Sequence, residues 1–178
     1  MKVGELMVKD VITCGDTARL GEIAKLMWEH DIGFIPVISS ENGAFAGVIT
    51  DRDGFLTAYF QGKELWNIPV RSAMSTQIAT CPPEADVEEA QQVMREFQVH
   101  RLPVVTKEGK LVGVVTLNDF ARKAAHDDNQ GLEEQVAVTL GAISAPRTSE
   151  APAQPRGGLM RLRETSSARH APPNASRA

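Results

Sequence analysis

The sequence has 178 residues, which is enough for one medium domain or two small ones. Its hydrophobic content of 42% is sufficient for a core, and its aromatic content of 5% predicts that this core is aliphatic. The net charge of −4 argues against non-specific nucleic-acid binding as the main function, so no nucleic-acid partner is expected.

The first residues, MKVGELMVKD, lack the apolar segment of a signal peptide, and no apolar run approaches the roughly 18 residues of a membrane span. We therefore expect a cytoplasmic protein without a membrane partner. Cys14 and Cys81 are too few for a disulfide framework and are expected to be free, buried thiols. The four histidines show no metal-ligand spacing, so no metal site is expected.

The chain contains one internal repeat. A shift of 67 places brings Cys14 onto Cys81, and one deletion opposite Asn42 extends the match until Asp53 falls on Asp119. This alignment contains 15 identities in 46 pairs, and most mismatches preserve hydrophobicity. A period this long with two copies indicates a duplicated small domain rather than a solenoid, so a pseudo-twofold axis is expected.

Each copy begins with the same two predicted elements. A short strand comes first, at Val11–Thr13 and at Ile78–Thr80. A helix follows over about Arg19–Glu29 and Asp86–Phe97, where apolar residues recur at helical spacing.

Two strands and a second helix complete each copy. The strands read FIPVIS and AFAGVIT in the first copy, and LPVVT and LVGVVT in the second. Between them, Asn-Gly and Glu-Gly steps supply the positive φ that a hairpin turn needs. Helices are then predicted at Asp51–Tyr59 and Leu117–Ala125, giving the order β-α-β-β-α twice. The predicted fold class is therefore mixed α/β (α+β).

Two different segments follow the repeats. Leu132, Val136 and Leu140 form an apolar stripe in a predicted third helix, and a lone amphipathic helix at the end of a domain usually docks on some surface. Residues 144–178 are rich in Pro, Ala, Ser and Arg and are predicted to be disordered. The tail arginines are interpreted as a solvated surface rather than as an RNA or acidic-partner contact.

A Thr-x-x-Asp motif ends the hairpin in each copy, at Thr50 with Asp53 and at Thr116 with Asp119. One interpretation is a helix cap, which contributes roughly 0.5–2 kcal/mol without any ligand. The other is a ligand site, because a helix N-terminus favours anions, a Thr hydroxyl can donate to a phosphate, and a carboxylate can accept from ribose hydroxyls. The spacing alone leaves both interpretations open.

The two β-α-β-β-α copies, with their IPV or LPV strands and G-V-[IV]-T-x-x-D closures, resemble a tandem pair of CBS domains over about residues 3–126. The chain looks like a bacterial stand-alone CBS-pair protein. The resemblance implies two repeats packed through their sheets, a homodimer built from helices, and clefts for adenosine-containing ligands in which the Thr and Asp of the motif contact the ligand. We expect repeat 1 at 1–61, a linker at 62–69, repeat 2 at 70–127, a C-terminal amphipathic helix at 128–143 and the tail at 144–178.

The two clefts are not expected to be equivalent. His100 and Arg101 precede a buried strand in the second copy, where Arg suits a bidentate phosphate contact, while the first copy has Gly33 and Phe34. A pair of solvent-facing side chains is the alternative. We expect the cleft reached by His100 and Arg101 to be the better site for an anionic ligand.

The complete candidate set of ligand-binding residues is taken from both copies. It comprises Thr50, Arg52, Asp53, Thr80, His100, Arg101, Pro103, Thr116, Asn118 and Asp119.

The predicted function is a non-enzymatic sensor that binds AMP, ADP, ATP, S-adenosylmethionine or a related regulatory ligand, requires no cofactor, and signals to an unknown protein partner in trans. The rival hypothesis is a structural dimerisation module in which the Thr-x-x-Asp motifs are only caps. An enzyme is the third choice, because no convergent acid, base and nucleophile set is visible.

Overall fold

The computed structural model describes residues 1–127 and 129–146 of the chain. The first repeat contains a short strand, a helix, a hairpin and a second helix, as the sequence predicts. Their bounds are β1 Cys14–Gly15, α2 Leu20–His30, β2 Phe34–Ile38, β3 Phe45–Thr50 and α3 Asp51–Gln61.

The second repeat has the same order except for its first strand. Its elements are α4 Val87–Phe97, β4 Arg101–Val105, β5 Leu111–Thr116 and α5 Leu117–His126. A short helix, α1 Val3–Leu6, precedes the repeats. The repeats are joined by two 3₁₀ turns, η1 Leu65–Asn67 and η2 Val70–Ser72. Helix α6, Gln130–Ser144, follows the second repeat. The tail predicted at 144–178 falls outside the described residues from position 147 onward.

The predicted first strands are wrong in detail. The strand expected at Val11–Thr13 is instead Cys14–Gly15, parallel to β2, and Ile78–Thr80 is not a strand. In the second repeat the equivalent pairing shrinks to one parallel bridge between Cys81 and Val104. The predicted strands lie too early in the sequence, because the chain reaches its parallel neighbour only from the cysteine onward in each copy.

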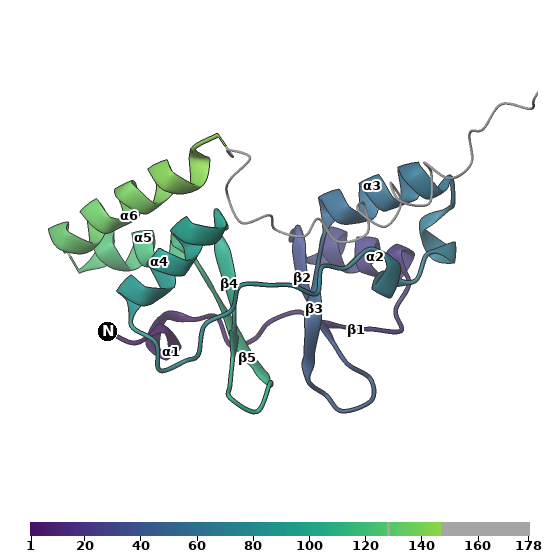
Figure 1. Cartoon of the computed structure of the whole chain (residues 1–178), viewed down its shortest axis with the longest axis horizontal. Helices are drawn as coiled ribbons and strands as arrows, with labels where there is room; N and C mark the ends of the chain where they lie inside the picture. The colour runs from purple at the N-terminus through teal and green to yellow at the C-terminus, as the bar shows by residue number, and fades with distance from the viewer. Residues whose placement is uncertain (128, 147–178) are drawn as a thin grey trace, which may run out of the picture.

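The two hairpins are antiparallel and carry the same irregularity. The register shifts after Val37 in β2 and at the equivalent Val104 in β4. Gly43 and Gly109 in the turns have φ of 71° and 78°, as predicted for the turn glycines. The hairpins lie side by side at the centre of the molecule (Figure 1), and the Phe45 N–H donates to the Gly109 carbonyl at 2.9 Å.

A segment from each repeat forms a β-bridge with the hairpin of the other repeat. Val8 bridges to Val114 of β5, and Ser75 bridges to Val48 of β3. Gly47 is required at the second of these contacts, because a Cβ there would lie 2.3 Å from the Ser75 carbonyl oxygen. The first residues of repeat 2, around Ser75, are therefore fixed against the end of repeat 1's hairpin, two residues from Thr50.

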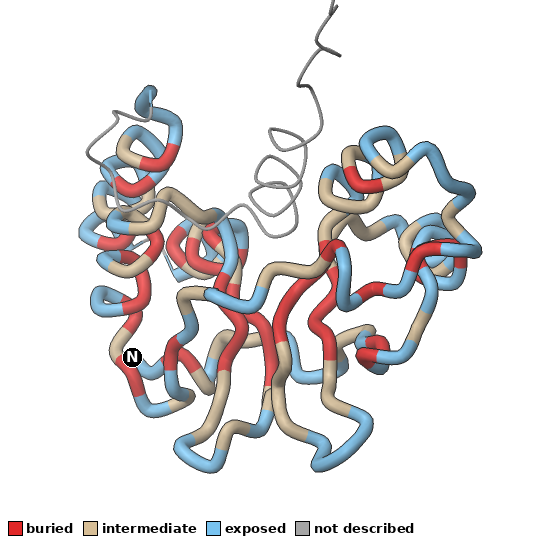
Figure 2. Tube along the Cα trace, turned by 45° about the vertical axis from the view of Figure 1, so that its right-hand side comes forward, coloured by how far each residue is buried: buried red, intermediate tan, exposed pale blue. Residues whose placement is uncertain are grey.

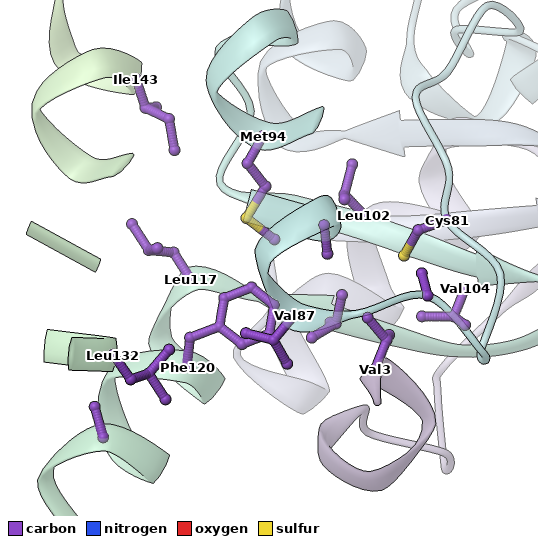
Figure 3. Packing of buried hydrophobic residues seen from close by; sticks show 14 residues of the cluster. Val3, Cys81, Val87, Met94, Leu102, Val104, Leu117, Phe120, Leu132 and Ile143 are labelled. Carbon is purple, nitrogen blue, oxygen red and sulfur yellow. The ribbon is translucent and has the colours of Figure 1, made fainter. Parts of the chain in front are cut away.

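The molecule has one hydrophobic core for each repeat, with the central strands buried (Figure 2). Residues Ile68 and Val70 join the core of repeat 1, and Val3 joins the core of repeat 2 (Figure 3). Packing therefore ties the first residues of the chain to repeat 2 and the segment between the repeats to repeat 1.

The helices form two outer groups on opposite sides of the strands, α2 with α3 and α4 with α5 (Figure 1). Helix α6 covers α4 and α5, where Leu132 and Ile143 pack into the core around Phe120 (Figure 3). Over the described range, no helix has both the length and the apolar character needed to span a membrane.

Candidate functional site

A cleft of about 760 Å³ lies between the two repeats. Its walls come from the start of β2, the β3–α3 junction, the segment before repeat 2 and the start of β4. The lining residues are Gly33, Phe34, Val48, Thr50, Asp51, Arg52, Asp53, Leu56, Phe60, Ser75, Gln77, Ile78, Ala79, Gln98, Val99, His100, Arg101 and Pro103. This volume is in the range typical of small-molecule sites.

The cleft brings together six of the ten candidate residues from both repeats. Thr50, Arg52 and Asp53 of repeat 1 face the same space as His100, Arg101 and Pro103 of repeat 2. Arg52 and the pair His100–Arg101, which belong to different copies in the sequence, thus share one cleft.

The other four candidates do not line this cleft. Thr80 is exposed just before the Cys81 bridge, Thr116 is half-buried, Asn118 is exposed and Asp119 is buried. Their predicted ligand contacts remain predictions for a second site.

The first Thr-x-x-Asp motif forms a complete helix cap. The Thr50 hydroxyl accepts from the Asp53 N–H at 3.2 Å and donates to Asp53 Oδ2 at 2.7 Å. The Thr50 N–H donates to the same carboxylate oxygen at 3.2 Å. Capping thus directs the threonine proton to Asp53, and within the described residues Asp53 Oδ1 accepts no hydrogen bond.

The second motif forms the same cap with one addition. The Thr116 hydroxyl and N–H donate to Asp119 Oδ2 at 2.7 and 2.8 Å. Asp119 Oδ1 is bound by the guanidinium of Arg122, which lies one helical turn further along α5. Both carboxylate oxygens of Asp119 are therefore engaged within the protein.

The cations of the cleft are exposed and separate from the carboxylates. Arg101 lies over the ring of Phe34, with the guanidinium carbon 5.3 Å from the ring centroid. Neither Arg52 nor Arg101 forms an ion pair with any described residue. The Asp51 carboxylate accepts a hydrogen bond from the backbone N–H of Arg52 at 2.7 Å, and this bond does not involve the Arg52 guanidinium. A guanidinium with no carboxylate partner is available to an anionic group of a ligand.

Sequence reasoning missed several cleft residues. It assigned no role to Asp51 or Leu56, although both lie within one turn of the motif and a helical projection places them near it. The residues of the segment at 75–79 carry no local signal, because only the crossover to the other repeat brings them to Thr50.

The cysteines are placed as expected. Both are free and buried, and burial raises the pKa of the Cys14 and Cys81 thiols to about 11. For Cys14, the negative charges of Asp16 and Glu22 add to this effect. Over the same described residues, no group of three or more His, Cys, Asp or Glu side chains is arranged to hold a metal ion.

The duplicated hairpin-and-helix fold, with an inter-repeat cleft bordered by a capped carboxylate and cations, defines a tandem small-domain protein. The family model of the CBS domain matches residues 3–54 and 70–126. The chain therefore belongs to the CBS domain family, as a tandem pair.

Curated relatives and solved structures agree with this assignment. The CBS domain-containing protein YhcV of Bacillus subtilis is 36% identical over 129 residues, which is 72% of this chain and 89% of YhcV. The crystal structure of the CBS domain pair of protein MJ0100, in complex with 5'-methylthioadenosine and S-adenosyl-L-methionine, has a TM-score of 0.61 and 25% identity. The match covers 71% of this chain and 98% of that one.

Longer enzymes are also similar, over a fraction of their length. The inosine-5'-monophosphate dehydrogenase of Korarchaeum cryptofilum is 32% identical over 140 residues, which is 79% of this chain and 28% of the enzyme.

Proposed function

We propose that this chain is a non-enzymatic regulatory module that binds an adenosine-containing ligand in the cleft between its repeats. The observation that carries the proposal is the meeting of Thr50 and Asp53 from repeat 1 with His100 and Arg101 from repeat 2 around one 760 Å³ cleft. A ligand that bridges them contacts both repeats at once, so its binding is coupled to their relative position.

The lining matches the three parts of such a ligand. Asp53 Oδ1 has no protein donor within the described residues and can accept from ribose hydroxyls. Arg52, His100 and Arg101 provide donors for phosphate or carboxylate oxygens. Ile78, Ala79, Val99 and Pro103 supply apolar surface for the adenine ring.

The ligand class is further supported by the MJ0100 domain pair, whose structure contains two adenosine derivatives. The candidate ligands are AMP, ADP, ATP and S-adenosylmethionine. All carry the ribose and adenine that the cleft recognises, and they differ in the charge presented to the cations.

A regulatory role fits the comparisons better than catalysis does. The similarity to the dehydrogenase spans 28% of that enzyme, whereas YhcV matches over 89% of its own length. The output then passes to a protein partner in trans, and the ligand shifts an equilibrium only by its differential affinity for two states.

We also propose that the protein forms a homodimer through α2 and α3. In repeat 2 the equivalent helices are covered by α6, and Arg95 of α4 donates to Thr139 of α6 at 2.9 Å. Trp28 occupies the position of Arg95 in repeat 1 and is 88% exposed. Phe55 and Tyr59 of α3 are likewise exposed, which leaves exposed aromatic side chains on both helices of repeat 1.

The rival function is a structural module without a ligand. It is favoured by one observation, because both Thr-x-x-Asp motifs form complete caps and so have a structural role of their own. Adenine absorbance released by denaturing the purified protein would count against this rival.

The test is a thermal-shift panel on ligand-stripped protein with AMP, ADP, ATP and S-adenosylmethionine. Ligand at 100 times its Kd stabilises the fold by about 2.7 kcal/mol, which gives a clear rise in Tm. Arg101→Ala is expected to weaken binding about tenfold or more, since hydrogen bonds to charged groups contribute about 1.5–3 kcal/mol. Lys107→Ala, which removes the same charge from the exposed hairpin turn outside the cleft, is the matched control. A flat panel, or equal effects of the two substitutions, would refute the proposal.

A further inference from the structure

The two Thr-x-x-Asp motifs differ in the residue that lies one helical turn after the aspartate. In repeat 1 this residue is Leu56, which lines the cleft. In repeat 2 the equivalent residue is Arg122, whose guanidinium binds Asp119. The repeat alignment places these two residues opposite each other, so the pair is a natural comparison within one chain.

The difference changes what the carboxylate can accept. Asp53 is half-buried, and its Oδ1 has no donor within the described residues. Asp119 is 6% exposed, with one oxygen held by Thr116 and the other by Arg122. A ribose hydroxyl that approaches Asp119 Oδ1 must share that oxygen with a charged donor or displace it, whereas it adds to a free acceptor at Asp53.

The charged residues around the two motifs also differ, and they too favour ligand binding at Asp53. Beside Asp53 the cleft contains Arg52, His100 and Arg101, none of which contacts that carboxylate. In repeat 2, Asn118 replaces Arg52, and Gly33 and Phe34 stand where symmetry would require His100 and Arg101. The cation that contacts Asp119, Arg122, thus belongs to the protein itself.

We propose that the Arg122 guanidinium occupies the acceptor oxygen of Asp119 in the second motif, and that this contact limits the protein to one adenosine ligand per protomer. Leu56 is the counterpart that keeps the first site open. This inference rests on the proposed function for the identity of the ligand, but the difference between the two motifs is independent of it.

The test is a reciprocal exchange followed by calorimetric titration with AMP and, separately, with S-adenosylmethionine. The wild type is expected to bind one ligand per protomer. Arg122→Leu is expected to add a second site, and Leu56→Arg, which supplies Asp53 with the guanidinium that Asp119 has, is expected to abolish binding at the first. The stoichiometry is the readout, and a thermal melt checks that each variant folds.

Arg122 is a suitable position for substitution because its side chain is 74% exposed. If Arg122→Leu does not fold, Arg122→Gln removes the charge while keeping a similar length, and the same second site is expected. Two sites in the wild type, or one unchanged site in a folded Arg122 variant, would overturn the inference.

Failure of the proposed function gives a different pattern. If the wild type binds neither ligand but Arg122→Leu gains one site, the proposed function of the first cleft is wrong and the role of Arg122 stands. If neither the wild type nor the folded Arg122 variant binds, both proposals are wrong.

Discussion

Asp16 is a buried carboxylate that joins its own segment to the hairpin of repeat 1 and to η2. Its Oδ1 accepts from the Ser40 N–H and hydroxyl at 3.1 and 2.7 Å, and its Oδ2 is bound by Arg71 of η2. These hydrogen bonds, led by that from the Ser40 hydroxyl, lower the pKa of Asp16 to about 2. The carboxylate therefore fixes both the hairpin and the segment between the repeats.

The lowered pKa predicts a pH dependence of stability. Because the folded-state pKa lies below the unfolded value of about 3.9, the contribution of Asp16 is complete above about pH 4 and is lost as the pH falls toward 2. Asp16→Asn is expected to lower the urea midpoint at pH 7, with the difference from wild type shrinking between about pH 4 and pH 2. Asp10→Asn, at an exposed position, is the control. A constant difference across this range would contradict the role of the charge.

The two cysteines are predicted to be unreactive in the folded protein. A rise of the thiol pKa from 9.0 to about 11 reduces the thiolate fraction about a hundredfold, and burial limits access further. Alkylation by iodoacetamide at pH 7.5, followed by mass spectrometry, should be slow in buffer and fast in urea. Rapid native labelling of Cys14 or Cys81 would contradict their buried placement.

At the scale of elements, α6 is held on repeat 2 by a buried polar contact as well as by its apolar face. Thr139 is fully buried, and its hydroxyl donates to Gln91 Oε1 at 3.0 Å and accepts from Arg95 at 2.9 Å. Gln91 is also fully buried, so loss of the hydroxyl leaves its oxygen without this donor.

Thr139→Val is therefore expected to lower the free energy of unfolding by about 1–3 kcal/mol, although it preserves the volume of the side chain. Thr139→Ser keeps the hydroxyl and should retain most of the stability. Denaturant unfolding of both variants measures the difference. Equal losses in the two would indicate that packing, rather than the hydrogen bond, holds α6.

The sequence predicted the elements well where the signal was local. The C-terminal helix that was expected at 128–143, with its apolar stripe, is found at Gln130–Ser144. Both hairpins and the helices that begin after Thr50 and Thr116 are also confirmed. The short strands before the helices were misplaced, because their pairing depends on where distant segments meet. The exchange of Val8 and Ser75 between the sheets is likewise a tertiary feature.

In the candidate site, too, the residues with a local sequence signal were predicted and those brought together by tertiary packing were not. Repeat comparison found Thr50 and Asp53 and the cations His100 and Arg101, and it predicted that the two clefts differ. It did not show that Arg52 shares a cleft with Arg101, since that follows from the packing of one repeat on the other. The contact between Arg122 and Asp119 is an i, i+3 pair that helical spacing could have indicated.

At the scale of the whole molecule, the aromatic surface on α2 and α3 predicts self-association. Trp28→Glu combined with Tyr59→Glu places charges at positions that are 88% and 72% exposed, so the fold should persist while the dimer dissociates. Light scattering after gel filtration should show a dimer for wild type and a monomer for the double variant. Val138→Glu, at a 58% exposed apolar position on α6, should remain dimeric. A monomeric wild type, or a dimeric double variant, would contradict the proposed interface.

The most direct test of ligand binding in the cleft is a crystal structure with the adenosine ligand that gives the largest thermal shift. We expect the ligand in the cleft between the repeats, with a ribose hydroxyl at about 2.6–3.2 Å from Asp53 Oδ1 and its charged group beside Arg101. A ligand bound elsewhere, or a cleft left empty at saturating ligand, would contradict it.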